Sequence, residues 1–364
     1  MRASPREFVK RHGRALAASV ALMVGFIWVL RAGALPLLPP RGTLDNVDFR
    51  GVVLAALLLL SNILLRFARY HFLIAPIAPI SMRRILTTSS IALGLLTFLP
   101  FRLGEFARPA MLREKGKLSG WAITGTVGAE RIIDGVLVSS VLLAGLAFAV
   151  PHEPLPERIG NLPVPAALVP HAARFAATVF GAAFLFMALF FYWRQGARRL
   201  TERSVGLVSK RLATRLADAV ERLSDGFRFL PKIRNTGPFV LITLLSFAAH
   251  VYALQVLARA VGLGELSFAE AAVVFGVLGL GFAMPNAPGF FGTVQLALYA
   301  GLAVYISPTR VVNQGAAFVF LFYVIYLVLV VLITASGLLA EYVLPAEESV
   351  QVGASVSPQS VEKP

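Results

Sequence analysis

The chain has 364 residues, of which 57% are hydrophobic and 15% are charged, and its mean hydropathy is +0.75. A soluble protein of this length needs more charge to cover its surface, so the composition indicates an integral membrane protein. The absence of cysteine excludes disulfides, thiolate metal sites and cysteine nucleophiles. The net charge of +15 would suit nucleic-acid binding, but in a membrane protein it indicates cytoplasmic loops beside anionic headgroups.

Long apolar runs without strict alternation predict helices rather than the strands of a barrel. A helix needs about 20 apolar residues to cross a bilayer. The runs are 15–38, 51–65 with its flanks, 85–101, 118–150, 175–193, 237–258, 271–309 and 311–340. Basic residues precede the first run and no small-residue cleavage site follows it, so we expect an uncleaved first span with the N-terminus inside.

Positive charge is concentrated in the segments 1–14, 66–84, 102–117 and 194–236. If the run at 85–101 crossed the membrane completely, the last two basic segments would lie outside, against the positive-inside tendency. A run that enters and leaves on the cytoplasmic side places all four segments inside. Its length of 17 residues, with Pro100 near the end, suits such a re-entrant hairpin.

The run at 271–309 has 39 residues, too many for one span, and "MPNAPGFFG" at its centre breaks any helix. A second hairpin, entered from outside, keeps the C-terminus inside. The order span, span, hairpin, span then occurs twice with opposite orientation, which is an inverted-topology repeat. We therefore predict an all-α polytopic membrane helical bundle with six spans and two re-entrant hairpins. Eight ordinary spans with an anomalous charge pattern are the alternative.

The chain is expected to divide into a basic cytoplasmic N-terminus (1–14), a transmembrane domain (15–340) and a disordered cytoplasmic tail (341–364). Within the transmembrane domain, 194–236 is expected to be a cytoplasmic amphipathic segment. Apolar residues recur there mostly every fourth position. Such a helix either lies on the inner leaflet or packs under the bundle.

Ionisable residues inside a membrane span are costly and are functional candidates. Glu130, Arg131 and Asp134 lie about ten residues inside the run that begins at 118. Glu130 and Asp134 share a helix face, and Arg131 can reach Asp134 at i+3. We expect a charge network, closed by Arg102 or Arg108. A structural lock and a ligand site are both open interpretations.

Arg102, Glu105 and Arg108 follow the first hairpin run and lie close to one face of a helix. Arginine forks bind phosphate with two parallel hydrogen bonds, and phospholipid headgroups supply phosphate at this depth. Arginines that snorkel to the interface are the alternative. We expect this snorkelling role for Arg66 and Arg69.

His250 stands alone in an apolar span, and we expect it to be a hydrogen-bonded core histidine rather than a proton relay. In the second hairpin, polar or backbone-permissive positions are candidates for headgroup contact. A helix break satisfied by neighbouring helices is the alternative. The candidate positions are Asn286, Pro288, Gly289, Gly292 and Gln295.

Three stretches, "LPFRLGEFARPAML", "GTVGAERIIDGVLV" and "PNAPGFFGTVQLAL", occur in this order. Together they resemble the lysylphosphatidylglycerol synthase transmembrane-region family, a flippase-like family, over roughly residues 10 to 340. The matches to its R-x-G-E-x-x-R, E-R-x-x-D and Pro-Gly motifs are Arg102, Gly104, Glu105, Arg108; Glu130, Arg131, Asp134; and Pro288, Gly289, Gly292. The resemblance implies a lipid-handling membrane domain in which these residues serve the substrate.

Two departures from the family pattern affect these expectations. Phe290 replaces a second glycine and Gln295 replaces an acid. If that acid binds a cationic headgroup in the family, this chain is expected to prefer another lipid. The soluble aminoacyl-transferase domain of fused members has no room after residue 340, so lysyl transfer by this chain is not expected.

We therefore expect a lipid translocase in the bacterial inner membrane, with both termini cytoplasmic, that moves a phospholipid or lipid-linked headgroup through a polar cavity. No cofactor or nucleic acid is expected, and no ATPase motif is present, so movement is downhill or ion-coupled. Expected partners are the lipid substrate, anionic inner-leaflet lipids, and a second copy or a lipid-synthesis enzyme. Two alternatives are a membrane transferase or hydrolase with Glu130 or Asp134 as general base, and a non-catalytic partner of a lipid- or glycan-synthesis enzyme.

Overall fold

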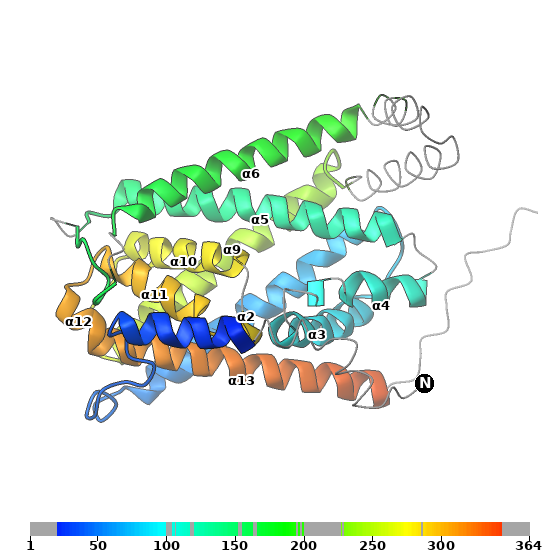
Figure 1. The fold of residues 1–364 in the computed structure, drawn as a ribbon. Coiled ribbons are helices and arrows are strands. Elements are labelled where there is room, and N and C mark those ends of the chain that lie inside the picture. Colours follow the sequence, from blue (N-terminus) through cyan, green and yellow to red (C-terminus); the bar gives the residue numbers. More distant parts are fainter. Residues whose placement is uncertain are drawn as a thin grey trace, which may run out of the picture.

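The computed structural model describes residues 20–99, 104–105, 107–116, 120–151, 155–162, 166–193, 196, 199, 227, 229–284 and 287–343. Within these residues the elements are helices, and no strand is formed (Figure 1). The one β-type contact in the described part is an isolated bridge between Ile159 and Leu162. The predicted all-α class is therefore confirmed for the described part of the chain.

Five helices are long and apolar enough to cross a membrane. The shortest of them has 25 residues, which at about 1.5 Å per residue exceeds the ~30 Å hydrocarbon core. A shorter apolar helix, Val20–Ala32, precedes them. The five are α2 (Phe49–Ile74), α5 (Gly120–Phe148), α6 (Leu168–Tyr192), α9 (Ile233–Ala260) and α13 (Gln314–Val343).

Large apolar side chains cover the outside of these helices. On α6, for example, Phe175 is 72% exposed and Phe186 is 70% exposed. A water-soluble protein does not present such a continuous apolar surface, whereas a bilayer solvates it. The chain is thus an all-helical, multi-pass integral membrane protein.

A pair of short helices follows α2. Helix α3 (Met82–Phe98) begins at the N-cap Ser81, whose hydroxyl accepts the N–H of Arg84. Helix α4 (Ala107–Gly116) follows it, and both lie at the same end of the bundle (Figure 1). At Gly104, between the two helices, an added Cβ would lie 2.1 Å from the backbone nitrogen of Leu96. Only glycine permits this close return of the chain onto α3.

A second pair of short helices lies near the opposite end of the bundle (Figure 1). Helix α10 (Phe268–Ala283) ends before the Pro-Gly segment, where the turn η2 (Pro288–Phe290) reverses the chain into α11 (Thr293–Ala303). The left-handed φ of 84° at Gly292 suits only glycine, and an added Cβ there would lie 2.2 Å from Phe26 of the first helix. The helix break predicted from the Pro and Gly residues is confirmed.

The long helices pack in a regular pattern. α2 packs along α9, and α5 packs along α6. Helix α3 packs against α13, just as α10 packs against α5. The amide of Asn62 on α2 donates to the backbone carbonyl of Ser246 on α9, 2.7 Å away, where both residues are buried. The short helix α12 (Pro308–Val312) leads into α13.

The N-terminal segment 1–19, most of 194–228 and the tail from 344 lie outside the described residues, so the predictions for them stay predictions. Of the amphipathic segment, the structure describes residues 196, 199, 227 and 229–236. There Phe227 contacts Phe190 of α6, with ring centroids 6.4 Å apart, and Phe229 contacts Phe239 of α9 at 5.8 Å. Helix α13 ends at Val343, a few residues beyond the predicted boundary at 340.

Candidate functional site

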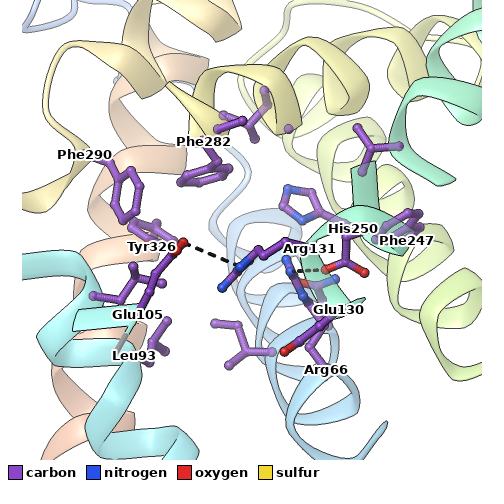
Figure 2. A pocket seen from close by; sticks show the side chains of 18 of the residues that line it. Arg66, Leu93, Glu105, Glu130, Arg131, Phe247, His250, Phe282, Phe290 and Tyr326 are labelled. Atoms are coloured by element: carbon purple, nitrogen blue, oxygen red, sulfur yellow. Dashed lines mark hydrogen bonds and ion pairs between the residues drawn. The ribbon is translucent and has the colours of Figure 1, made fainter. Parts of the chain in front are cut away.

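A cavity of about 510 Å³ lies among the helices, with lining residues from α2, α3, α5, α9, α10 and α13 (Figure 2). Its two walls differ in chemistry. The first half of the chain supplies the charged lining residues Arg66, Glu105, Arg108, Glu130, Arg131 and Asp134. The second half supplies most of the aromatic ones. Figure 2 shows Arg66, Glu130 and Arg131 on one side, the charged wall, and Phe282, Phe290 and Tyr326 on the other, the aromatic wall.

Arg69 on α2 is the centre of the charge network behind this wall. Its guanidinium forms two hydrogen bonds of 2.6 Å to Asp134 and one of 3.0 Å to Glu130. It also donates to the hydroxyl of Thr243 at 2.7 Å and lies 5.0 Å from the centroid of the Phe239 ring. The side chain is 0% exposed. Arg69 thus joins α2, α5 and α9 and has no access to the cavity.

The expectation that Arg66 and Arg69 snorkel to the interface is wrong. The apolar run ends at residue 65, but α2 continues to Ile74, so both arginines lie within the helix. Arg66 donates to Asp134 at 3.0 Å and lines the cavity, with 37% of its side chain exposed. The i, i+3 spacing of Arg66 and Arg69 could have indicated a shared partner, because it places both side chains on one face of the helix.

Arg108 closes the network from the first hairpin, as predicted. It donates to Glu130 at 2.9 Å, and its guanidinium lies 4.5 Å from the centroid of the Tyr70 ring. The Tyr70 hydroxyl lies 3.0 Å from that of Thr126 on α5. Glu130 therefore has one oxygen bound by Arg69 and the other by Arg108. The hairpin is fixed to α5 through this pair.

Arg131 does not pair with Asp134, which corrects the i+3 expectation. Its Nε lies 3.5 Å from a carboxylate oxygen of Glu105, across the cavity from α5 to the first hairpin (Figure 2). This distance exceeds that of a good charged hydrogen bond. The two side chains are 34% and 22% exposed, so this is the more open part of the network. Arg131 and Arg66 are accordingly the described cations with the most access to the cavity.

The aromatic wall is a packed cluster. Phe282 at the end of α10 meets Phe290 of η2 at a centroid distance of 5.0 Å and Tyr326 of α13 at 5.8 Å. The rings touch one another, so no cation fits between them as in an aromatic cage. Their faces instead provide an apolar surface opposite the arginines.

His250 lies on the same side of the cavity as Glu130 and Arg131 (Figure 2). It is a buried core residue as expected, but the expected hydrogen bond is missing at Nε2. The side chain lines the cavity and is 9% exposed. Its Nε2 is buried and has no hydrogen-bond partner in the described structure. A single polar residue in an apolar span marked His250 as unusual in the sequence. Whether another side chain would form a hydrogen bond with it could not be read from the sequence.

The structure does not bring the described polar residues of the second hairpin to the cavity. Gln295 is buried and accepts the N–H of Gly292 at 2.7 Å, so it caps α11. The carbonyl of Gly289 accepts a hydrogen bond from the Tyr323 hydroxyl. Of this segment's described residues, Phe290 is the one that lines the cavity. Arg102 and Asn286 lie outside the described residues.

Gly104 lines the cavity, but its close approach to α3 shows that it also serves packing. In the part of the chain that is described, no group of three or more histidine or acidic side chains is arranged to hold a metal ion. The carboxylates are bound by arginines instead.

Comparison with known proteins gives one family. Residues 15–337 match the family model described as the lysylphosphatidylglycerol synthase TM region. The match covers most of the chain and includes all the residues of the charge network, so the resemblance seen in the three sequence motifs is confirmed. Searches of curated proteins and of solved structures gave no match.

Proposed function

The chain belongs to the lysylphosphatidylglycerol synthase TM region family, and we propose that it is a lipid translocase that moves an anionic headgroup between leaflets. In this proposal the headgroup enters the cavity from the cytoplasmic side. The acyl or isoprenoid chains stay in the bilayer or against the aromatic wall. No covalent change of the lipid is involved.

The observation that carries the proposal is the charge balance of the network. Its described members are four arginines (66, 69, 108 and 131) and three carboxylates (Glu105, Glu130 and Asp134), which leaves an excess of one positive charge. An uncompensated charge at membrane depth is unfavourable. A phosphate group that reaches the cavity would balance the charge.

Arg131 and Arg66 are the ligand-binding candidates, because their side chains are 34% and 37% exposed and line the cavity. Arg69 is buried and Arg108 is 14% exposed, with a short bond to Glu130. Arg69 supports the site from behind, and Arg108 lines the cavity but is held by Glu130. In this proposal Arg69 and Arg108 form the structural lock, and Arg66 and Arg131 form the ligand site. The two interpretations of the sequence then apply to different arginines of one network.

The opposite wall suits the rest of a lipid. Phe282, Phe290 and Tyr326 offer ring faces beside the charged wall. A water-soluble anion would gain nothing from this apolar surface, whereas a lipid buries its glycerol and chain there. The combination of charged and aromatic walls favours an amphiphilic substrate over a free phosphate.

The helix arrangement supports the proposed topology of six spans and two re-entrant hairpins in an inverted repeat. The N-cap residues Ser81 and Ser267 begin α3 and α10, and each accepts a backbone N–H three residues later. The packing of α3 on α13 mirrors that of α10 on α5. Val20–Ala32 and the five long helices would be the six spans.

We propose that the end of the bundle that holds α4 faces the cytoplasm. The start of α3, with Arg83 and Arg84, and the C-terminal end of α13 lie at this end (Figure 1). The positive-inside tendency favours this orientation in a bacterial inner membrane. Both termini would then be cytoplasmic, and anionic inner-leaflet lipids would be the first contacts of the basic end.

The enzyme alternative is less well supported, because the carboxylates proposed as general bases are occupied. Asp134 accepts hydrogen bonds from Arg66 and Arg69, and Glu130 accepts from Arg69 and Arg108. A general base needs a free oxygen within reach of the proton that it removes. Neither side chain offers one in this arrangement.

The test is a leaflet-transfer assay with the purified protein in proteoliposomes. We expect a fluorescent anionic phospholipid to move between leaflets faster than in protein-free liposomes, and its mass to stay unchanged. A zwitterionic lipid with the same chains is the matched substrate and should move more slowly. Equal transfer with and without protein, or a lipid of changed mass, would contradict the proposal.

A further inference from the structure

One residue of the peripheral helix α6 reaches the cavity. Helix α6 lies at the edge of the bundle beside α5, and its outward side chains Phe175 and Phe186 are 72% and 70% exposed (Figure 1). Of the α6 residues, which the structure describes throughout, Phe180 is the one that lines the cavity. It is half-buried and is the central residue of the helix. Phe180 therefore stands between the cavity and the bilayer, near the middle of the membrane.

A glycine on α5 makes room for the ring of Phe180. A Cβ added to Gly135 would lie 2.1 Å from the Cδ1 atom of Phe180 and 2.4 Å from its Cγ atom. Any larger side chain at this position would therefore displace the ring. Gly135 also lines the cavity and directly follows Asp134 of the charge network. The ring thus fills a notch in α5, formed by Gly135, at the level of the charged wall.

Helix α10 ends at the same level as this notch. α10 and α5 run antiparallel, because Gly276 packs against Leu142 and Gly279 packs against Val138. About one helical turn further on, the last residue of α10, Ala283, is level with the notch. Ala283 is exposed and also lines the cavity, so the cavity has an opening where α10 stops. Nearer its start, α5 is packed by α4 instead (Figure 1).

The surroundings of this opening suit a hydrocarbon chain. The side chains of Leu280, Ala283 and Phe180 are apolar, and all three line the cavity. A charged group in the hydrocarbon core of a bilayer is costly, whereas a lipid chain is already at home there. A lipid whose headgroup lies at the arginines therefore needs an apolar passage for its chain at this depth.

The Phe180 ring can leave the notch at little cost. A phenylalanine side chain turns about χ1 between staggered rotamers. Turned outward, the ring would lie among lipid chains, which are as apolar as the side chains that it leaves. A polar or charged side chain at this position would pay for the same movement with its hydrogen bonds. An aromatic ring at the edge of the bundle is therefore suited to move between the cavity and the bilayer.

We propose that Phe180 is a lateral gate of the cavity. With its ring in the notch it narrows the opening beside α10, and with its ring turned outward a hydrocarbon chain of the lipid passes between α6 and the end of α10. The chain then extends from the bilayer toward the aromatic wall while the headgroup lies at the arginines. This inference rests on the proposed function, because it takes the ligand of the cavity to be a lipid.

The experiment is photo-crosslinking in liposomes of dioleoylphosphatidylglycerol and dioleoylphosphatidylcholine. Benzoylphenylalanine in place of Tyr326, on the aromatic wall, inserts into C–H bonds of chains that enter the cavity (Figure 2). Phe180→Ala should raise the yield of chain adducts several-fold, and the milder change Phe180→Leu should give a smaller rise. Phe175→Ala makes the same change on the outward face of α6 and should leave the yield unchanged. Benzoylphenylalanine at Phe186, which faces outward, should capture lipid equally in all variants and so controls for folding and insertion.

Three results would overturn the assignment: an unchanged yield in both Phe180 variants, an equal rise in Phe175→Ala, or adducts that fragmentation places on the headgroup alone. The capture of chains is measured without reference to transport. If Phe180 controls capture but the protein moves no lipid between leaflets, the translocase is refuted and the gate stands. If the protein moves lipid but the Phe180 variants capture chains like the parent, the gate is refuted and the translocase stands.

Discussion

Replacing Arg69 by methionine removes the cation that joins three helices behind the cavity. The variant loses the two 2.6 Å bonds to Asp134, the 3.0 Å bond to Glu130 and the 2.7 Å bond to Thr243. Breaking a buried ion pair costs roughly 3–5 kcal/mol, because an unpaired charge is left behind. Here Asp134 keeps Arg66 and Glu130 keeps Arg108, so we expect about 3 kcal/mol.

Arg131→Met is the matched control, since it makes the same replacement in the same network. Arg131 is 34% exposed and has, among the described residues, one ion pair of 3.5 Å to Glu105, so its loss should cost about 0–1 kcal/mol. Unfolding in detergent, followed by tryptophan fluorescence, compares the two variants. The double variant Arg69→Met with Asp134→Leu should recover part of the stability, because the buried carboxylate that has lost its two 2.6 Å bonds is removed together with its main partner. Equal destabilisation by Arg69→Met and Arg131→Met would refute the assignment of Arg69 as the structural centre.

Further predictions concern topology, the second hairpin and the exposed ion pair. In this cysteine-free chain, single cysteines at Arg83 and Gly116, on either side of the first hairpin, should both resist an impermeant thiol reagent applied outside intact cells; labelling of either one contradicts the re-entrant arrangement. Gly292→Ala should lower stability by more than about 1 kcal/mol because φ is 84° and the first helix is in contact, whereas Gly181→Ala, which has open space, should be neutral or stabilising by detergent melting. Glu105→Gln should raise the affinity for an anionic lipid several-fold by native mass spectrometry, because it releases a cavity-facing arginine; weaker binding would argue against that role.

The sequence was sufficient to locate the charged α5 site and the helix breaks. Glu130, Arg131 and Asp134 stand out because charge inside an apolar run is unusual, and the Pro and Gly residues between α10 and α11 stop any helix there. Both features are local, so a window of a few residues contains the whole signal.

The partners in the network could not be predicted, because they depend on how distant helices pack. Arg69 and Asp134 are 65 residues apart, and only the packing of α2 beside α5 and α9 brings them together. An arginine at the end of an apolar run is usually interfacial, which is why Arg69 was assigned to the wrong environment. The prediction that Gln295 contacts the ligand is not supported for a similar reason. Its side-chain amide can bind a ligand or cap α11, and in the folded chain it accepts the N–H of Gly292 and caps the helix.

The most direct test of a headgroup site in the cavity is the initial rate of leaflet transfer of an anionic fluorescent phospholipid in proteoliposomes. The double variant Arg66→Gln with Arg131→Gln removes the two most exposed of the described cations that line the cavity, and Arg83→Gln removes an exposed cation at the start of α3 as the matched control. Each charged hydrogen bond is worth about 1.5–3 kcal/mol, so the double variant should be slower by a factor of about ten or more. Arg83→Gln should transfer lipid at the wild-type rate. Unchanged transfer in the double variant, or an equal loss in Arg83→Gln, would contradict the account.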